Sequence, residues 1–197
     1  YPNLILFLKK NIDRGFENQS LFEIGPLFSG KKPGQQITVI CGLRKDNLID
    51  VFDIKKDVVQ TLVELGIDKN ETSININTPS YYHPGRSGAI ITKNDKKLLA
   101  YFGEIHPKII DKTYGFEIFL ESLVKYKIQN KKDKPTITFS DYQKSDRDFA
   151  FVVNKDFQAQ KLLEIINNID RSLIKDVRIF DVYVGKNIPL DKKSIAL

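Results

Sequence analysis

An apolar stripe at helical spacing, set between two alternating segments, constrains the fold of this 197-residue chain more than any other feature. The stripe lies in QAQKLLEIINNID and consists of Ala159, Leu162, Leu163, Ile166 and Ile169. A helix with such a stripe can cover one face of a sheet. The segments on either side, FAFVV and the stretch after Asp176, alternate with the period of two that is typical of strands. The sequence therefore predicts a helix packed on a sheet.

A further strand is predicted to begin at Ser194, after the loop GKNIPLDKK. The order strand, helix, strand, strand is the first part of a ferredoxin-like unit. A complete unit has one more helix and one more strand, so we expect about 30 further residues to be missing. The absence of methionine and the apolar ending KKSIAL also indicate a piece of a longer protein. We therefore expect a truncated βαββ unit with an exposed apolar patch.

The two faces of this small sheet differ in character. The face that the helix is expected to cover carries the apolar residues Phe149, Phe151, Phe180 and Val182. The face expected to stay open presents Ala150, Asp181, Tyr183 and Ser194. An aromatic ring can stack on an unpaired base, and a carboxylate can accept hydrogen bonds from its N–H edge. From these residues alone, the alternative is a solvated strand with an amphipathic tyrosine.

The first part of the chain combines apolar strands with two amphipathic helices. We expect the helices over residues 3–14 and from Asp53 to Gly66, with Asp53 as the N-cap. The predicted strands are LFEIGPLF, QITVICGLR, SININTP, AIIT, LLAYFGEI and FEIFLES. The first two form a hairpin, SYYHPGRSG is a loop, and His106 opens a short helix. The expected class is α+β, an antiparallel sheet with flanking helices.

A polar segment closed by proline, IQNKKDKP, divides the chain. Its composition is typical of an interdomain linker. We therefore expect a first domain over residues 1–127, a linker over 128–135 and a second domain over 136–197.

The loop HPGRSG is the first candidate for chemistry in the first domain. His83 and Arg86 could bind an anion or a carboxylate, or lie at an interface. A hydrolase would use Ser87 with His83, but the sequence offers no third partner. A purely structural loop is the remaining interpretation.

Two other pairs of polar residues carry weaker signals. Glu104 and His106 could act as an acid–base pair, although His106 is better explained as a cap of the following helix. Glu23 and Arg44, on the two strands of the first hairpin, are expected to form a structural ion pair. Neither pair predicts a catalytic site.

Composition excludes several functional classes. No apolar run approaches the ~20 residues that span a bilayer, so we expect no membrane partner. Cys41 is the single cysteine, which rules out an internal disulfide and any zinc spacing, and its apolar surroundings predict a core thiol in a cytosolic protein. The net charge of +6 allows nucleic-acid contact without requiring it.

Several motifs in order resemble one family over nearly the whole chain. SDRDFAFVV followed by FDVYVGKNIPLDKKSIAL is similar to the ferredoxin-fold anticodon-binding domain that ends the bacterial phenylalanyl-tRNA synthetase beta subunit. LFEIGPLF, GLR, DIKKDVVQTLVELG, YHPGRSG and FGEIHP resemble the preceding module of that subunit, in the same order. The resemblance implies a class II synthetase-like but non-catalytic first domain, and Pro26 stands where the family often has a basic residue.

The same resemblance implies a function. The family charges tRNA(Phe) with phenylalanine, using ATP and Mg²⁺, as an (αβ)₂ heterotetramer in the cytoplasm. The active site lies on the alpha subunit, so this piece is expected to hold no cofactor or metal and no catalytic residue.

Carried over by position, the residues that face the anticodon are Ala150, Asp181, Tyr183 and Ser194. Tyr183 is expected to stack on the first anticodon base, a guanine, and Asp181 to accept from its N1–H and N2–H₂ groups. A different class of function remains open: ferredoxin-like domains also sense small molecules. Such a regulatory module would bind its ligand between Asp181 and the helix and would leave no footprint on tRNA.

Overall fold

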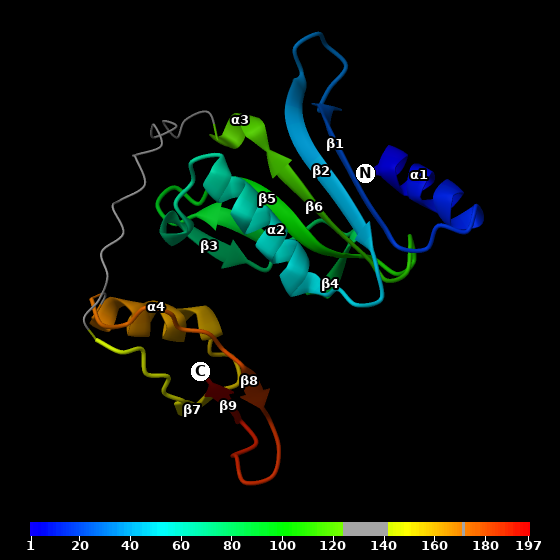
Figure 1. Cartoon of the computed structure of the whole chain (residues 1–197). Helices are drawn as coiled ribbons and strands as arrows, with labels where there is room; N and C mark the ends of the chain where they lie inside the picture. The colour runs from blue at the N-terminus through cyan, green and yellow to red at the C-terminus, as the bar shows by residue number, and fades with distance from the viewer. Residues whose placement is uncertain (124–141, 171) are drawn as a thin grey trace. The chain divides into compact units, whose positions relative to one another are not determined.

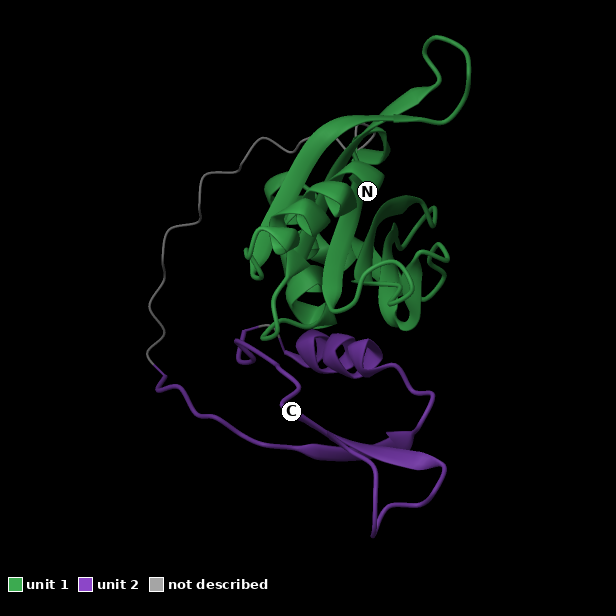
Figure 2. Cartoon of the chain, turned by 90° about the vertical axis from the view of Figure 1, so that its right-hand side faces the viewer, with its two compact units in different colours: residues 1–135 green, residues 136–197 purple. Residues whose placement is uncertain are grey.

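The computed structural model describes residues 1–123, 142–170 and 172–197. The chain divides into two compact units, Tyr1–Pro135 and Thr136–Leu197 (Figure 2). The expected linker, residues 128–135, lies outside the described residues.

The first unit is built on a six-stranded antiparallel sheet (Figure 1). Its elements are α1 (Pro2–Asp13), β1 (Gln19–Phe28), β2 (Gln36–Lys45), α2 (Val51–Glu64), the 3-10 turn η1 (Lys69–Glu71), β3 (Thr72–Asn75), β4 (Tyr82–Thr92), β5 (Leu98–Ile105), β6 (Thr113–Phe119) and α3 (Leu120–Leu123). The strand order is β1-β2-β6-β5-β4-β3, and β1 and β2 form the predicted hairpin. The predicted α+β class is therefore confirmed.

Helices pack on both faces of this sheet. On one face, α2 buries Ile54, Val58 and Leu62 in a cluster that includes Ile90 and Ile118 of the sheet. A second cluster contains Leu4 and Leu8 of α1 together with Leu43 of β2 and Ile105 of β5. Leu43 and Ile118 lie in neighbouring strands on rows of opposite parity, which places the two clusters on opposite faces.

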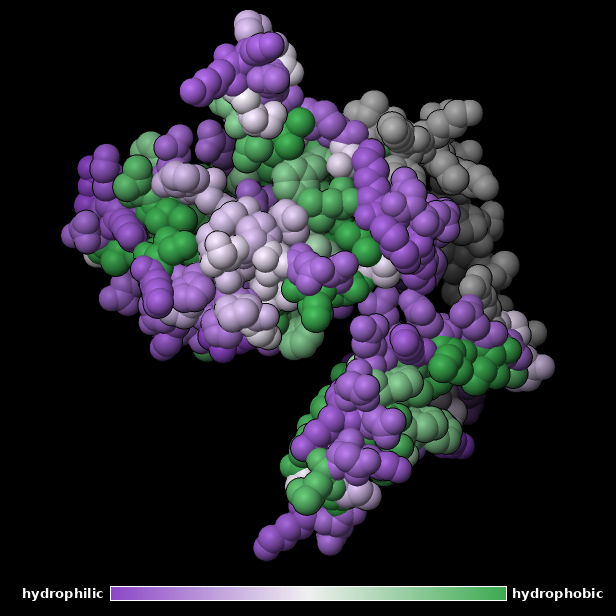
Figure 3. Space-filling model, turned by 180° about the vertical axis from the view of Figure 1, so that it is seen from behind, coloured by the Kyte–Doolittle hydropathy of each residue, from purple (hydrophilic) through white to green (hydrophobic). Residues whose placement is uncertain are grey.

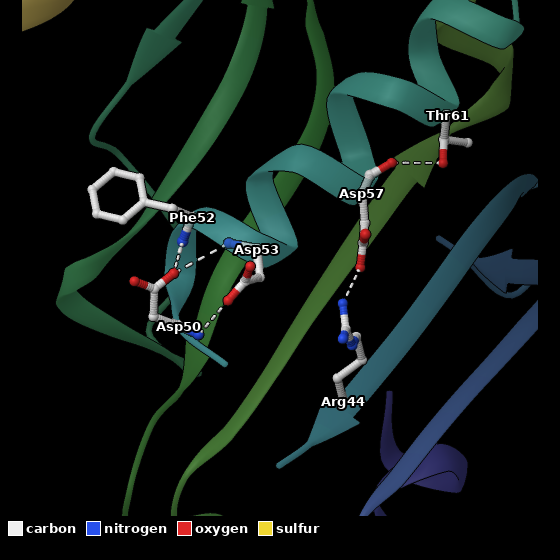
Figure 4. A network of polar contacts seen from close by, with 6 residues as sticks. All are labelled: Arg44, Asp50, Phe52, Asp53, Asp57 and Thr61. Atoms are coloured by element: carbon white, nitrogen blue, oxygen red, sulfur yellow. Dashed lines mark hydrogen bonds and ion pairs between the residues drawn. The ribbon is translucent and has the colours of Figure 1, made fainter. Parts of the chain in front are cut away.

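The N-terminus of α2 differs from the prediction. The Asp50 carboxylate accepts from the backbone N–H groups of Phe52, at 2.7 Å, and of Asp53, at 3.2 Å (Figure 4). Asp53 reciprocates by accepting from the backbone N–H of Asp50, at 2.8 Å. Asp50 is thus the N-cap and Asp53 the third residue of a capping box, so the prediction of Asp53 as the cap is wrong. The spacing D-x-x-D offers two carboxylates, and only the backbone geometry separates their roles.

The predicted Glu23–Arg44 ion pair is also wrong. Arg44 donates instead to Asp57 of α2, with 2.8 Å between Nη1 and Oδ2 (Figure 4). Glu23 lies opposite Cys41, three residues from Arg44 along β2, so Glu23 and Arg44 point to opposite faces of the sheet. The arginine therefore ties α2 to the sheet.

The segment HPGRSG lies within β4 and not in a loop. Pairing with β5 is irregular between Tyr82 and Ser87, which leaves room for the glycine and proline of the motif inside the strand. No helix follows His106; the chain makes one turn there, and His106 Nδ1 accepts from the backbone N–H of Lys108 at 3.2 Å. The predicted short helix is therefore wrong, and the His106 ring accepts a hydrogen bond within a turn instead of capping a helix.

The second unit consists of β7 (Ala150–Asn154), α4 (Ala159–Ile169), β8 (Asp181–Tyr183) and β9 (Lys192–Ala196). The strands pair antiparallel in the order β7-β9-β8, which gives the predicted ferredoxin-like succession of strand, helix, strand, strand. Leu162 of α4 packs with Ile195 of β9 and with Leu197 in a small core. The stripe of α4 thus packs on the sheet in part, through Ala159, Leu162 and Ile166, whereas Ile169 stays 71% exposed.

The strand expected over Val177–Val184 is shorter than predicted. Only Asp181–Tyr183 is strand, since β9 pairs with β8 through Ser194–Ala196 alone. Freed from strand geometry, Val177 and Ile179 pack against the core of α4. The residues predicted for the covered face, Phe149, Phe151, Phe180 and Val182, stay 37–60% exposed.

The expected exposed apolar surface is therefore present on this unit. Figure 3 shows apolar residues gathered on its visible side. Val152 of β7 is also exposed, at 55%, but it projects to the opposite face of the small sheet.

Candidate nucleic-acid interface

The register of the small sheet brings the four predicted site residues onto one face. Ala150 and Asp181 both lie opposite Ala196, one on each side of the central strand β9. Tyr183 lies opposite Ser194. Directly opposed residues of an antiparallel sheet project to the same face, and residues two apart along a strand do so as well. The four residues therefore share a face, here called the open face.

The helix α4 lies on the other face of this sheet. Its core partners Val153 and Ile195 have the opposite parity along β7 and β9, and Ile195 is fully buried. On the open face, Ala150 and Asp181 are exposed, Tyr183 is 47% exposed and Ser194 is half-buried. The open face is thus a shallow surface that no described helix covers.

Four further residues belong to the open face, and one of them is Ala196, which lies opposite both Ala150 and Asp181. Val152 lies opposite Ser194, and Asn154 lies opposite Lys192 at the next row. The predicted site stops at Ser194, because the strand is expected to begin there; β9 begins two residues earlier, at Lys192. The sequence signal available for these residues is their spacing. Val152 lies two residues from Ala150, and Lys192 and Ala196 each lie two residues from Ser194. Asn154 lies four residues from Ala150, which is the same parity along the strand.

The ring of Tyr183 is held by the turn that follows β8. Its hydroxyl donates to the Lys186 carbonyl at 3.3 Å. The ring lies so close to Gly185 that a Cβ atom there would stand 2.5 Å from the hydroxyl oxygen and 2.7 Å from Cζ. Glycine is therefore needed at this position if the ring is to keep its place.

Asp181 presents an acceptor-only group at one end of the open face. Among the described residues, no cation lies within ion-pair distance of its carboxylate. Both oxygens are thus available to a ligand with paired N–H donors, such as a base edge or a guanidinium. Together with the adjacent ring, this arrangement can hold a flat heteroaromatic group and read one of its edges.

The predicted pair His83 and Arg86 lies in the first unit and is not brought together with the open-face residues. Arg86 donates from Nε to Glu104, whose side chain is 5% exposed. This bond lowers the pKa of Glu104 and outweighs the opposing effect of desolvation. His83 Nδ1 accepts from the backbone N–H of Gly85 at 3.0 Å. Both residues therefore have structural partners: that of Arg86 lies in β5, and that of His83 lies within the bulged part of β4.

The hydrolase interpretation of HPGRSG finds no support in these contacts. Ser87 Oγ donates to the backbone carbonyl of His83 at 2.7 Å and lies 2.8 Å from the Thr78 hydroxyl. No hydrogen bond joins this serine to the His83 ring in the described part of the chain. Glu104 is paired with Arg86, not with His106, which excludes the acid–base pair as well.

A buried tyrosine–glutamate network lies inside the first unit, and the sequence does not indicate it. Tyr81 donates to Glu117 Oε2 at 2.6 Å, and Tyr82 does so at 3.4 Å. Burial raises the pKa of Glu117, and the hydrogen bond from Tyr81 partly opposes that shift. Cys41 lies opposite Glu117 in the sheet, and burial raises the pKa of its thiol to about 11. The partly buried Cys41 packs against the apolar cluster of α1, as predicted.

In residues 1–123, 142–170 and 172–197, no three His, Cys, Asp or Glu side chains gather in a group that could hold a metal ion. No helix within the same ranges is long and apolar enough to cross a membrane.

Comparisons with known proteins agree with the two-unit division of the fold. Residues 1–118 match the family model of the phenylalanyl tRNA synthetase beta chain CLM domain, and residues 140–197 match that of the ferredoxin-fold anticodon binding domain. Similar relatives are the phenylalanine–tRNA ligase beta subunits of Paramagnetospirillum magneticum and Rhodospirillum rubrum, each 37% identical over 100% of this chain and 26% of their own length. The beta subunit of Bartonella quintana is 32% identical over 100% of this chain and 27% of its length. The chain thus spans about a quarter of the length of these curated relatives.

Proposed function

Since the chain belongs to the phenylalanyl-tRNA synthetase beta chain family, we propose that it is part of a phenylalanine–tRNA ligase and binds the anticodon of tRNA(Phe). The observation that carries this proposal is the open face, where the register sets Tyr183 beside Asp181 with small side chains around them. The match of residues 140–197 to the anticodon binding domain supports the same assignment.

The chemistry of the open face suits an unpaired guanine. The half-exposed Tyr183 ring offers a surface on which the base can stack. The Asp181 carboxylate has two acceptor oxygens, which match the adjacent N1–H and N2–H₂ donors of guanine. Ala150 and Ser194 project little from the sheet and leave room for the base. Adenine lacks this pair of donors, so the face distinguishes the two purines.

The charging reaction itself is assigned to another chain. We place the ATP- and Mg²⁺-dependent activation of phenylalanine on an alpha subunit, with which this subunit forms an (αβ)₂ heterotetramer in the cytoplasm. The first domain, residues 1–127, then acts as a synthetase-like scaffold, joined by residues 128–135 to the anticodon-binding domain, residues 136–197. Arg86 is half exposed while paired with Glu104, and we propose it with His83 as a contact to the alpha subunit or to an anionic group.

Filter binding with transcripts tests the anticodon assignment. The full-length subunit, assembled with its alpha subunit, is titrated with tRNA(Phe) and with a variant whose first anticodon base is adenine. Tyr183→Ala should weaken tRNA(Phe) binding by about 1–3 kcal/mol, or roughly 5- to 150-fold, because the stacking surface is lost.

Asp181→Asn provides the matched test of base reading. The amide has a single acceptor oxygen, so the preference for guanine over adenine should shrink while stacking persists. Unchanged binding of both transcripts by both variants would refute the assignment. Wild-type protein that leaves the anticodon unprotected would instead favour a ligand-binding regulatory module.

A further inference from the structure

We propose a phosphate subsite on the open face, formed by Lys192 and Asn154, which takes a backbone phosphate of the RNA strand whose base stacks on Tyr183. The subsite rests on the proposed anticodon binding and extends it to the sugar–phosphate backbone. It adds two residues that lie outside the predicted site.

The register places both residues beside the base-binding residues. Asn154 of β7 and Lys192 of β9 are directly opposed, so they project to the same face. Lys192 lies two residues from Ser194 on the same strand, about 7 Å along it, and shares its parity. Asn154 and Lys192 thus form the row of the open face that follows Val152, Ser194 and Tyr183.

Lys192 is within reach of the base that Tyr183 would hold. Because Tyr183 lies opposite Ser194, Lys192 is its diagonal neighbour, about 7–8 Å away between backbones. A lysine side chain covers this distance and keeps its ammonium in solvent. The ammonium and the Asn154 amide both donate hydrogen bonds, as a phosphodiester requires.

The open face carries a negative charge at one end and a positive charge at the other, an arrangement that suits one nucleotide. Asp181 marks the row at Ala196, and Lys192 lies four residues away on β9, about 13 Å along the strand. A base stacked between these rows on Tyr183 would present its donor edge to Asp181. Its sugar and phosphate would then extend to the opposite end. No described carboxylate forms an ion pair with Lys192, so its charge is available to an anion.

The neighbouring Lys193 supplies a matched control. It lies opposite Val153, on the face that α4 covers, although it is one residue from Lys192 and carries the same charge. Replacing either lysine by alanine changes the net charge of the chain equally. Only Lys192 should contact the phosphate.

The experiment is a salt titration of tRNA(Phe) binding by the full-length subunit assembled with its alpha subunit. Wild type, Lys192→Ala, Lys193→Ala, Lys192→Arg and Asn154→Ala are compared from about 50 to 200 mM salt. Lys192→Ala should weaken binding about threefold to tenfold and reduce the slope of log K against log[salt] by about 0.7, the value for one phosphate on a single strand. Lys192→Arg and Asn154→Ala should keep the slope. The first substitution retains the positive charge, and the second removes an uncharged side chain.

The outcomes separate this inference from the anticodon proposal. One outcome would overturn the phosphate subsite and leave the anticodon proposal intact. In that outcome the wild type prefers guanine, but Lys192→Ala and Lys193→Ala both have the wild-type slope. Equal reductions in slope for the two alanine variants overturn it as well, because they show a general charge effect. Thermal unfolding of each variant identifies any loss of fold. The subsite is supported if Lys192→Ala has the melting temperature of the wild type and a reduced salt slope.

Discussion

Gly185→Ala tests whether the turn after β8 holds the stacking surface. The backbone of Gly185 does not lie in the left-handed region, so alanine can adopt it. The added methyl would stand 2.5 Å from the hydroxyl oxygen of Tyr183 and 2.7 Å from Cζ, which is closer than real Cβ contacts come. The ring must therefore swing away from its place, while the sheet and the core around Ile195 are left intact.

The size of the effect follows from the contacts that the ring would lose. Moving the ring breaks the bond from its hydroxyl to the Lys186 carbonyl, an exposed contact that orients the ring and does not itself bind the RNA. It also forfeits part of the 1–3 kcal/mol that a stacked base provides. We expect tRNA(Phe) binding to weaken by about 1–2 kcal/mol, or roughly 5- to 30-fold.

A double-mutant cycle isolates the cause. Filter binding is measured for wild type, Gly185→Ala, Tyr183→Ala and the double variant, all in the assembled enzyme. If Gly185 acts only by positioning the ring, Gly185→Ala should barely change the binding free energy of a protein that already carries Tyr183→Ala. The two losses should then not add. Fully additive losses would refute the reasoning, and an equal melting temperature for wild type and Gly185→Ala is the control for folding.

Two further predictions concern the first unit. The pKa of Glu117 is raised by burial, so this residue favours folding at low pH, and that contribution is lost as the pH rises through its folded pKa. Glu117→Gln should therefore flatten the fall of unfolding free energy as the pH rises above the ordinary glutamate pKa of 4.5, measured by urea denaturation. An unchanged pH dependence would contradict this. Asp50→Ala should lower the unfolding free energy by about 0.5–2 kcal/mol and cost more than Asp53→Ala; the reverse order in thermal melts would restore Asp53 as the cap.

Much of the fold could be predicted because its signals are local and periodic. The stripe of α4 and the alternation in FAFVV specify which faces meet, and the same alternation puts Ala150 on the open face. The hairpin of β1 and β2 follows from two apolar runs around a polar turn. Such patterns can be recognised without knowing the distant segment on which each element packs.

The features that the sequence did not predict share one physical origin, since each of them depends on a partner that is distant in the sequence. The length of β8 is set by how much of β9 faces it, which the alternation after Asp176 cannot show. Arg44 reaches Asp57 because α2 crosses that face of the sheet. Glu117, in the apolar strand β6, becomes buried because Tyr81 and Tyr82 provide donors from β4 and the segment before it.

The central strand β9 explains how one core residue can set the geometry of the proposed RNA surface. Lys192, Ser194 and Ala196 project to the open face, while Ile195 projects to α4 and is fully buried. A slip by one residue would exchange the two sets, burying a serine and a lysine and exposing the isoleucine. Because the burial of Ile195 disfavours that slip, it also fixes the distance along the strand between the base-reading row at Asp181 and the proposed phosphate row at Lys192. The apolar core and the recognition surface are thus specified by the same register.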